Sequence, residues 1–224
     1  MLDWAKITTV LLDMDGTILD LHFDNHFWLN HLPMRYSEKQ QISLIQAQAE
    51  LEKAYQKVDG SIYWYCLDYW AKQTQLPITQ LKREVQHLIT LREDAHDFLV
   101  ALKESGREVV LVTNAHPDSL SLKIEQTQLD SYFDQLYSTH VFGVTKESQL
   151  LWQKLQQEHG FGCENTLFVD DSENILAAAK QFGIQHLLAV ANPDSKKPNN
   201  NISHYSAITD FRSLIADIKA NPVV

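Results

Sequence analysis

The chain contains few cysteines, and their spacing offers neither a disulfide framework nor a metal-binding motif. Only Cys66 and Cys163 occur among 224 residues, and they form no C-x-x-C pair. Isolated free cysteines usually pack as small apolar side chains. We therefore expect both to be buried or half-buried thiols rather than parts of a disulfide or a metal site.

Long apolar stretches are also missing. No run approaches the roughly 20 apolar residues that span a bilayer. The first residues, Met1–Lys6, lack the charged and apolar regions of a signal peptide. These absences predict a cytoplasmic protein without a membrane partner.

Acidic residues outnumber basic residues in this chain. The 19 basic and 29 acidic residues leave a formal net charge of −10, which argues against binding nucleic-acid polymers, since this requires a basic face. A phosphorylated small molecule remains compatible, because a bound cation and one lysine can dominate the field locally. The sequence carries no signal for the oligomeric state.

From about residue 92 onward, short apolar strands alternate with amphipathic helices. The expected strands are 109–112, 134–138, 166–169 and 184–190, in addition to Val10–Leu12 near the start. The expected helices are 93–105, 117–129, 147–159, 172–182 and 209–218. This alternation is typical of an α/β fold with a doubly wound parallel sheet covered on both faces.

Residues 20–91 differ in composition and hydrophobic pattern from the rest of the chain. Residues 40–58 and 78–89 read as helices, and residues 62–70 are dense in aromatic side chains. We expect an inserted helical cap at 20–91, within a core formed by 1–19 and 92–224. The aromatic run is expected to form mainly the core of this insert, with one or two rings facing a pocket.

The most informative segment is Asp13-Met14-Asp15-Gly16-Thr17, which follows the apolar run Val10–Leu12. A calcium-binding EF-hand loop is disfavoured, because the glycine is fourth instead of sixth and the twelfth position is Asp24 instead of glutamate. Two carboxylates in a tight turn at the end of a buried strand instead suit a hard cation such as Mg²⁺ and phosphate chemistry.

Three further polar elements follow predicted strands or begin predicted helices. They are Thr113-Asn114, Lys146 and Asp170-Asp171. Singly, each has a simpler explanation as a helix cap or a solvated surface lysine. In a parallel sheet, however, all of them would lie on one edge together with the first acidic pair. Their joint occurrence favours one site.

Phosphoryl transfer needs such a set of groups. One carboxylate can attack phosphorus, and a second can protonate the leaving oxygen and then activate water. A cation reduces the repulsion between the carboxylates and the phosphate, while a lysine and a hydroxyl hold the remaining oxygens.

The D-x-D-G-T, T-N, lysine and D-D elements, in this order, resemble the four motifs of the haloacid dehalogenase superfamily. An insert directly after the first motif resembles the helical cap of its C1 subclass. The resemblance implies that Asp13 is the nucleophile and a Mg²⁺ ligand. It also implies that Asp15 is the general acid/base and offers its backbone carbonyl to the metal.

The same resemblance assigns the other motifs. Thr113 and the backbone amides of Asn114 and Ala115 would bind phosphate, and Lys146 would neutralise the nucleophile and the phosphate. Asp171 would ligate the metal directly, with Asp170 acting directly or through water; spacing alone does not decide between these two.

An aspartate at position 15 points to a phosphate ester or a phosphomutase, because dehalogenases of the superfamily lack it. The resemblance extends to its purine 5′-nucleotidase branch, through segments such as Phe23-Asp24-Asn25 and Asn192-Pro193-Asp194-Ser195. This implies GMP and IMP as substrates, to be released as nucleoside and phosphate. The candidate contacts of the purine are Asp24, Asn25, Trp28, Tyr63 and Trp64. For each of them, a structural role in the cap or its hinge is an equal alternative.

Two other functions stay open at this point. One is a sugar-phosphate phosphatase or phosphomutase of the same superfamily. The other is a catalytically silent metabolite-binding module, which the complete set of acidic and basic residues disfavours.

Overall fold

The computed structural model describes residues 2–223, and its centre is a six-stranded sheet in the order β3-β2-β1-β4-β5-β6. Every neighbouring pair of strands is parallel. The strands are β1 (Thr9–Leu12), β2 (Glu108–Thr113), β3 (Gln135–Ser138), β4 (Thr166–Asp170), β5 (His186–Val190) and β6 (Ala207–Ile208). The predicted α/β fold with a parallel sheet is confirmed.

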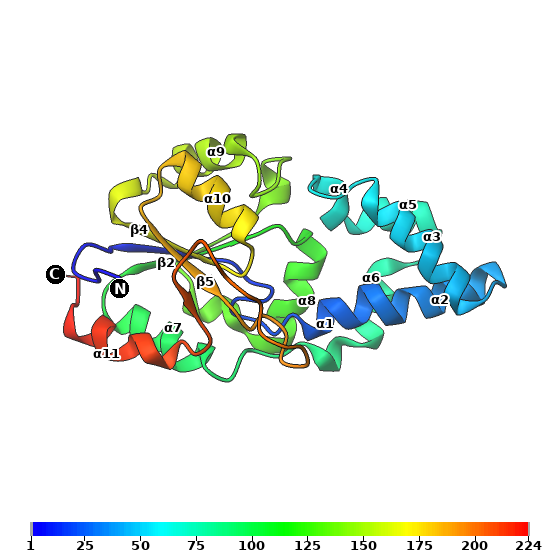
Figure 1. The fold of residues 1–224 in the computed structure, drawn as a ribbon, viewed down its shortest axis with the longest axis horizontal. Helices are drawn as coiled ribbons and strands as arrows, with labels where there is room; N and C mark the ends of the chain where they lie inside the picture. Colours follow the sequence, from blue (N-terminus) through cyan, green and yellow to red (C-terminus); the bar gives the residue numbers. More distant parts are fainter. Residues whose placement is uncertain (1, 224) are drawn as a thin grey trace.

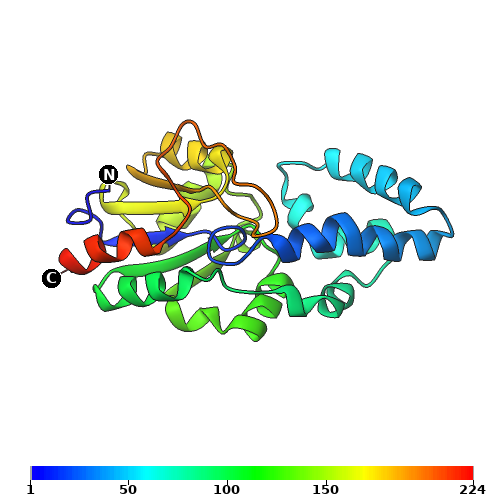
Figure 2. The same cartoon turned by 60° about the horizontal axis from the view of Figure 1, so that its bottom comes forward.

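Helices cover both faces of this sheet (Figures 1 and 2). One face carries α7 (Ala95–Glu104), α8 (Pro117–Thr127) and α11 (Arg212–Ala220), and the other carries α9 (Gln149–His159) and α10 (Glu173–Phe182). Successive side chains of a strand point to opposite faces. Accordingly, Val10 and Leu12 pack in the first of two apolar clusters, and Leu11 packs in the second.

The helices and strands of this layer lie close to the predicted ranges. The two-residue strand β6 was not predicted, because two residues carry no detectable periodicity. Short 3₁₀ turns also occur at η3 (Leu129–Tyr132), η4 (Thr139–Val141) and η5 (Cys163–Asn165).

Residues between β1 and α7 form a group of helices beside the sheet, drawn in blue to cyan-green in Figure 1. They are α1 (His22–His26), η1 (Phe27–His31), α2 (Leu32–Gln40), α3 (Leu44–Gln56), α4 (Ile62–Tyr65), α5 (Leu67–Thr74), α6 (Ile78–Glu84) and the 3₁₀ turn η2 (Gln86–Leu88). A continuous helix over 22–40 was not predicted. Its middle turn, η1, is π-helical and ends at His31, two residues before Pro33, whose missing N–H removes one helical hydrogen bond.

The chain enters and leaves this helical segment at neighbouring points. Leu19 and Leu91 form an isolated antiparallel bridge. The Asp20 N–H donates to the Thr90 carbonyl (3.0 Å), and the Arg92 N–H donates to the Ile18 carbonyl (3.0 Å). The two connections therefore run side by side, beyond the carboxyl end of the central strand β1.

Aromatic rings form the interior of the helical segment. The Tyr55 ring lies 4.9 Å from Trp70, 5.2 Å from Trp64 and 6.1 Å from Trp28, in edge-to-face arrangements. Trp70 is fully buried, whereas Tyr63 is 56% exposed. No helix among residues 2–223 is long and apolar enough to cross a membrane.

Candidate active site

Three acidic or hydroxyl positions meet because the sheet register aligns the ends of three adjacent strands. Leu12 of β1 pairs with Leu111 of β2 and with Val169 of β4. The next residue, Asp13, donates its N–H to the Val169 carbonyl (3.0 Å). Thr113 and Asp170 are the last residues of β2 and β4, so both flank Asp13 at the carboxyl edge of the sheet.

Lys146 joins two of these strand ends. Its Nζ donates to Asp13 Oδ1 and to Asp170 Oδ2 (2.7 Å), and its side chain is 2% exposed. Burial by itself lowers the pKa of Lys146, but Asp13 and Asp170 outweigh it and hold the pKa above its ordinary value. The ammonium is therefore a permanent buried positive charge against the acidic group.

The side chain of Asn114 holds the backbone of Lys146 in place. Its Oδ1 accepts from the Lys146 N–H (2.9 Å) and from Thr139 Oγ1 (3.1 Å). Thr113 Oγ1 accepts from the Ala115 N–H (3.0 Å). The loop after β2 thus ties the hydroxyl of Thr113 and the start of the Lys146 segment into one rigid unit.

The carboxylates of Asp13, Asp170 and Asp171 each place an oxygen within 4.8 Å of the others. Burial raises the pKa of Asp13 to about 6, with Lys146 opposing and Asp170 adding to the shift. Burial and the neighbouring carboxylates of Asp170 and Asp13 raise the pKa of Asp171 well above its ordinary value. One ammonium does not balance three carboxylates, and oxygen donors in this number and spacing fit a hard divalent cation.

The two neighbouring aspartates after β4 differ in their partners. Asp170 is fully buried, and it accepts from Lys146 Nζ (2.7 Å) and from the Ser172 N–H (2.9 Å). Within residues 2–223, no hydrogen bond joins the Asp171 side chain to another residue. Asp171 is therefore the one with oxygens available for a cation.

Gly16 allows the first acidic loop to approach Asp171. Its φ is +86°, and a Cβ at this position would lie 2.7 Å from Asp171 Oδ2. Both the backbone conformation and the contact require glycine.

We expect Gly16→Ala to lower kcat/KM by about 100-fold, because displacing a catalytic group by about 1 Å can cost this much. Gly160→Ala is the matched control. Gly160 has a φ of +89°, and a Cβ added there would meet nothing within 4 Å, so it introduces the same backbone strain without the contact. Steady-state kinetics on both variants separate the effect of the Cβ contact with Asp171 from the effect of backbone strain. Equal losses would show that strain alone matters at position 16.

Asp15 belongs to a second buried ionic network, which the sequence did not reveal. Lys123 of α8 donates to Asp15 Oδ1 (2.5 Å) and to Asp24 Oδ2 (2.6 Å), and Lys82 of α6 donates to Asp24 Oδ1 (2.9 Å). Burial raises the pKa of Asp15 to about 6 despite the opposing charge of Lys123. Burial acts in the same direction on Asp24, but Lys123 and Lys82 together hold its pKa below the ordinary value.

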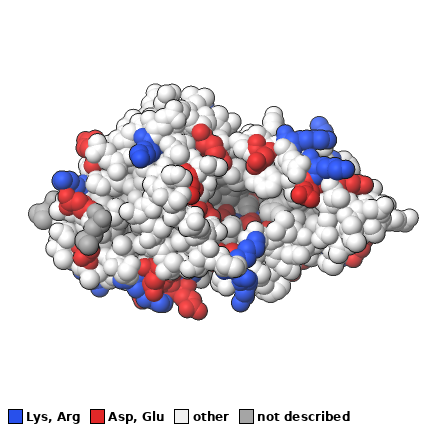
Figure 3. Space-filling model, in the orientation of Figure 1, with Lys and Arg blue, Asp and Glu red and all other residues white. Residues whose placement is uncertain are grey.

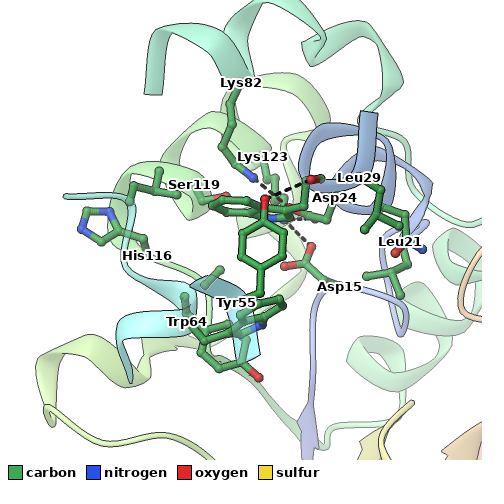
Figure 4. Close-up of a pocket in the computed structure, with 15 residues that line it drawn as sticks. Asp15, Leu21, Asp24, Leu29, Tyr55, Trp64, Lys82, His116, Ser119 and Lys123 are labelled. Atoms are coloured by element: carbon green, nitrogen blue, oxygen red, sulfur yellow. Dashed lines mark hydrogen bonds and ion pairs between the residues drawn. The ribbon is translucent and has the colours of Figure 1, made fainter. Parts of the chain in front are cut away.

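A cavity of about 220 Å³ lies between the helical segment and the sheet edge. Figure 3 shows the corresponding hollow, with acidic side chains inside it. Figure 4 shows Asp15 and Asp24 on one side of the view, Trp64 and His116 on the other, and Tyr55 between them. The lining residues are Asp15, Leu21, Asp24, Asn25, Trp28, Leu29, Tyr55, Trp64, Tyr65, Leu67, Lys82, Ala115, His116, Ser119 and Lys123.

Four of the five predicted purine contacts line this cavity, namely Asp24, Asn25, Trp28 and Trp64. Both oxygens of Asp24 already bind lysines, and Asn25 Nδ2 donates to Asp194 Oδ2 (2.7 Å). Tyr63 lies outside the cavity and packs against Tyr69. Trp28 and Trp64 also pack against Tyr55 and Trp70, so each ring serves both the interior of the helical segment and the cavity wall.

Comparison with known proteins identifies the class of protein that has this fold and this acidic site. Residues 7–183 match the haloacid dehalogenase-like hydrolase family, and the chain belongs to it. Among solved structures, a HAD phosphatase from Thermococcus onnurineus has the same fold, with a TM-score of 0.80 and 21% identity over 97% of this chain and 100% of that one.

Proteins with similar sequences include nucleotidases and a phosphatase. The GMP/IMP nucleotidase YrfG of Escherichia coli (strain K12) is 45% identical over 215 residues, which are 96% of this chain and 97% of that protein. The protein of the same name from Shigella flexneri matches equally. A phosphoglycolate phosphatase of Aliivibrio fischeri is 25% identical over 65% of this chain and 64% of that protein.

Proposed function

We propose that this protein hydrolyses purine nucleoside 5′-monophosphates, GMP and IMP, to nucleoside and phosphate with the help of Mg²⁺. The similarity to the nucleotidases, 45% over 96% of the chain, supports the substrate class. The observation that carries the proposal is that Asp15 and the rings of Trp28 and Trp64 line one cavity. A phosphate at the carboxylates would place its organic group against aromatic walls.

In the first step, a carboxylate oxygen of Asp13 attacks phosphorus, and the bond between phosphorus and the 5′ oxygen breaks. Lys146 Nζ, which contacts Asp13 Oδ1, holds the nucleophile and the phosphate oxygens in line. Thr113 Oγ1 and the backbone amides of Asn114 and Ala115 would bind the other phosphate oxygens. The product of this step is an aspartyl-phosphate on Asp13.

Asp15 handles the proton in both steps. Its carboxylic acid protonates the departing 5′ oxygen, which leaves as the nucleoside hydroxyl. The resulting carboxylate then takes a proton from a water molecule that attacks phosphorus, and the bond to Asp13 breaks. A pKa of about 6 suits both roles near neutral pH, and Lys123 keeps the Asp15 side chain in place.

The cation site of this proposal consists of Asp13, Asp171 and the backbone carbonyl of Asp15, with Asp170 supporting it through Lys146 or water. A divalent cation bound there would offset the repulsion between the carboxylates and the phosphate. Burial raises the pKa values of Asp13 and Asp171, and neighbouring carboxylates add to the shift, so a cation bound there would favour the charged forms of both side chains.

We further propose that residues 20–91 act as a cap over the core residues 1–19 and 92–224. Trp28 and Trp64 would offer faces to the purine, and Asp24 and Asn25 would shape the wall and hold the cap in position. Tyr63 is not part of this proposal, since it is exposed and outside the cavity.

The test is a phosphate-release screen with Mg²⁺ over nucleotides and sugar phosphates. We expect GMP and IMP to give the highest kcat/KM, and pyrimidine nucleotides to give lower values because a smaller ring covers less aromatic surface. Preference for a sugar phosphate, or isomerisation of one without phosphate release, would establish the phosphatase or phosphomutase alternative. No release from any ester would indicate a binding module.

A further inference from the structure

A second cluster of metal-binding side chains lies outside the acidic site. One ligand atom from each of Cys66, His116 and His140 lies within 4.8 Å of the other two. All three side chains are half-buried. Their sequence positions are too far apart to form a recognisable motif, so sequence reasoning treated Cys66 as a packing thiol.

These residues come from different parts of the fold. Cys66 lies between α4 and α5 of the helical segment. His116 precedes α8 at the end of the β2 loop, and His140 lies in η4 after β3. The cluster therefore spans the junction between the helical segment and the sheet layer, at the side of the cavity where Figure 4 shows His116.

The ring of His140 carries an unsatisfied polar atom. Its Nε2 is buried, and no group among residues 2–223 forms a hydrogen bond with it. An orphaned buried nitrogen is costly unless a partner occupies it.

A fourth donor is close by. Asp68 Oδ2 lies 3.7 Å from His116 Nε2, and the Asp68 side chain is 86% exposed and free to turn inward. His116 Nδ1 accepts from the Asp118 N–H at 3.2 Å. Coordination through Nε2 would move the ring proton to Nδ1 and break this one long hydrogen bond.

We propose that Cys66, His116 and His140 bind Zn²⁺ or another thiophilic divalent cation, with Asp68 or water as the fourth ligand. Bond lengths of about 2.3 Å to sulfur and about 2.0 Å to nitrogen in a tetrahedron place ligand atoms about 3.5 Å apart. The ligand atoms now lie within 4.8 Å of one another, so side-chain movements of about 1 Å would bring them to the tetrahedral separation. Binding releases the thiol proton of Cys66 to solvent, because the thiolate is the ligand.

This site has a consequence for the cavity. Tyr65 and Leu67, which flank Cys66, line the cavity together with His116. A cation shared by Cys66 and the two histidines would hold α4 and α5 against the loop after β2. Zn²⁺ would therefore slow substrate entry and product release, an effect that rests on the proposed function, whereas metal binding itself does not.

Co²⁺ titration of the full-length protein, with excess Mg²⁺ present to occupy the acidic site, tests the binding directly. We expect the strong visible bands of tetrahedral Co²⁺, a near-ultraviolet thiolate-to-metal charge-transfer band, and loss of both when Zn²⁺ is added. Cys66→Ser should abolish the charge-transfer band. His140→Gln should weaken binding at least about tenfold, as the loss of metal-site groups commonly does. Thermal unfolding verifies that each variant is folded.

Cys163→Ser is the matched control, because Cys163 is the other half-buried free thiol. It should keep the spectrum and the affinity. Weak bands of six-coordinate Co²⁺ without charge transfer would place the metal on carboxylates alone and overturn the proposal. A charge-transfer band that survives in Cys66→Ser and disappears in Cys163→Ser would overturn it too. In the phosphate-release assay, Cys66→Ser should need at least about tenfold more Zn²⁺ for half-inhibition.

Discussion

Asp13→Asn is expected to abolish phosphate release, with kcat at least about 10⁴-fold lower, while the fold stays intact. An amide oxygen cannot attack phosphorus to form the acyl phosphate, so the first step has no nucleophile. The fold should survive, because Lys146 keeps its hydrogen bond to Asp170 (2.7 Å) and the variant removes a buried charge from a crowded acidic group. Phosphate release at saturating GMP and circular dichroism measure the two effects.

Asp130→Asn serves as the control for this variant, since Asp130 is an exposed aspartate in η3. It should leave kcat unchanged. Rapid acid quenching adds a second readout, because only a chain with Asp13 should retain labelled phosphate on the protein during turnover. Activity of Asp13→Asn above a few per cent of wild type would refute the nucleophile assignment.

Removal of divalent cations is expected to lower activity by at least about 10³-fold, and added Mg²⁺ should restore it. Asp13, Asp170 and Asp171 then face the phosphate dianion with Lys146 as the only adjacent cation among residues 2–223. Electrostatic stabilisation of the transition state is commonly worth this much or more. The measurement is phosphate release in EDTA, followed by titration with Mg²⁺.

EDTA already saturated with Mg²⁺ is the control for effects of the chelator itself. Asp171→Asn should raise the Mg²⁺ concentration for half-activation, because no hydrogen bond within residues 2–223 occupies the carboxylate oxygens of Asp171. Full activity in metal-free EDTA would contradict the cation site. A rate that increases on addition of the Mg²⁺-saturated EDTA would point to removal of an inhibitory ion from Cys66, because EDTA exchanges Mg²⁺ for more tightly bound ions such as Zn²⁺.

The sheet was largely predictable, because the strands are short apolar runs bounded by helices with clear periodicity. Val10–Leu12 and 166–169 are buried on both faces, and such strands read as uninterrupted apolar segments. The helix over 22–40 was not predictable in the same way. Its π-helical turn and Pro33 interrupt the regular spacing, and its stability comes from packing of Phe27 and Leu32 against other helices.

The meeting of Asp13, Thr113 and Asp170 was predictable because each lies at the end of a strand, and the parallel register brings strand ends together. Lys82 and Lys123 were not, because a lysine on a helix usually lies in solvent. Both are 1% exposed, and what turns them inward is Asp24, which is distant in sequence. Pairing of this kind depends on tertiary contacts that leave no local pattern.

The side-by-side connections at Leu19 and Leu91 have a consequence for how such a chain can be rebuilt. Two ends that already touch can be joined by an inserted segment of almost any length, because neither end has to travel to meet the other. A foreign lid grafted between these points, or a short turn replacing everything between them, should leave the parallel sheet able to fold by itself. Such an exchange would have to retain Asp24, because Asp24 pairs with Lys123, which also binds Asp15.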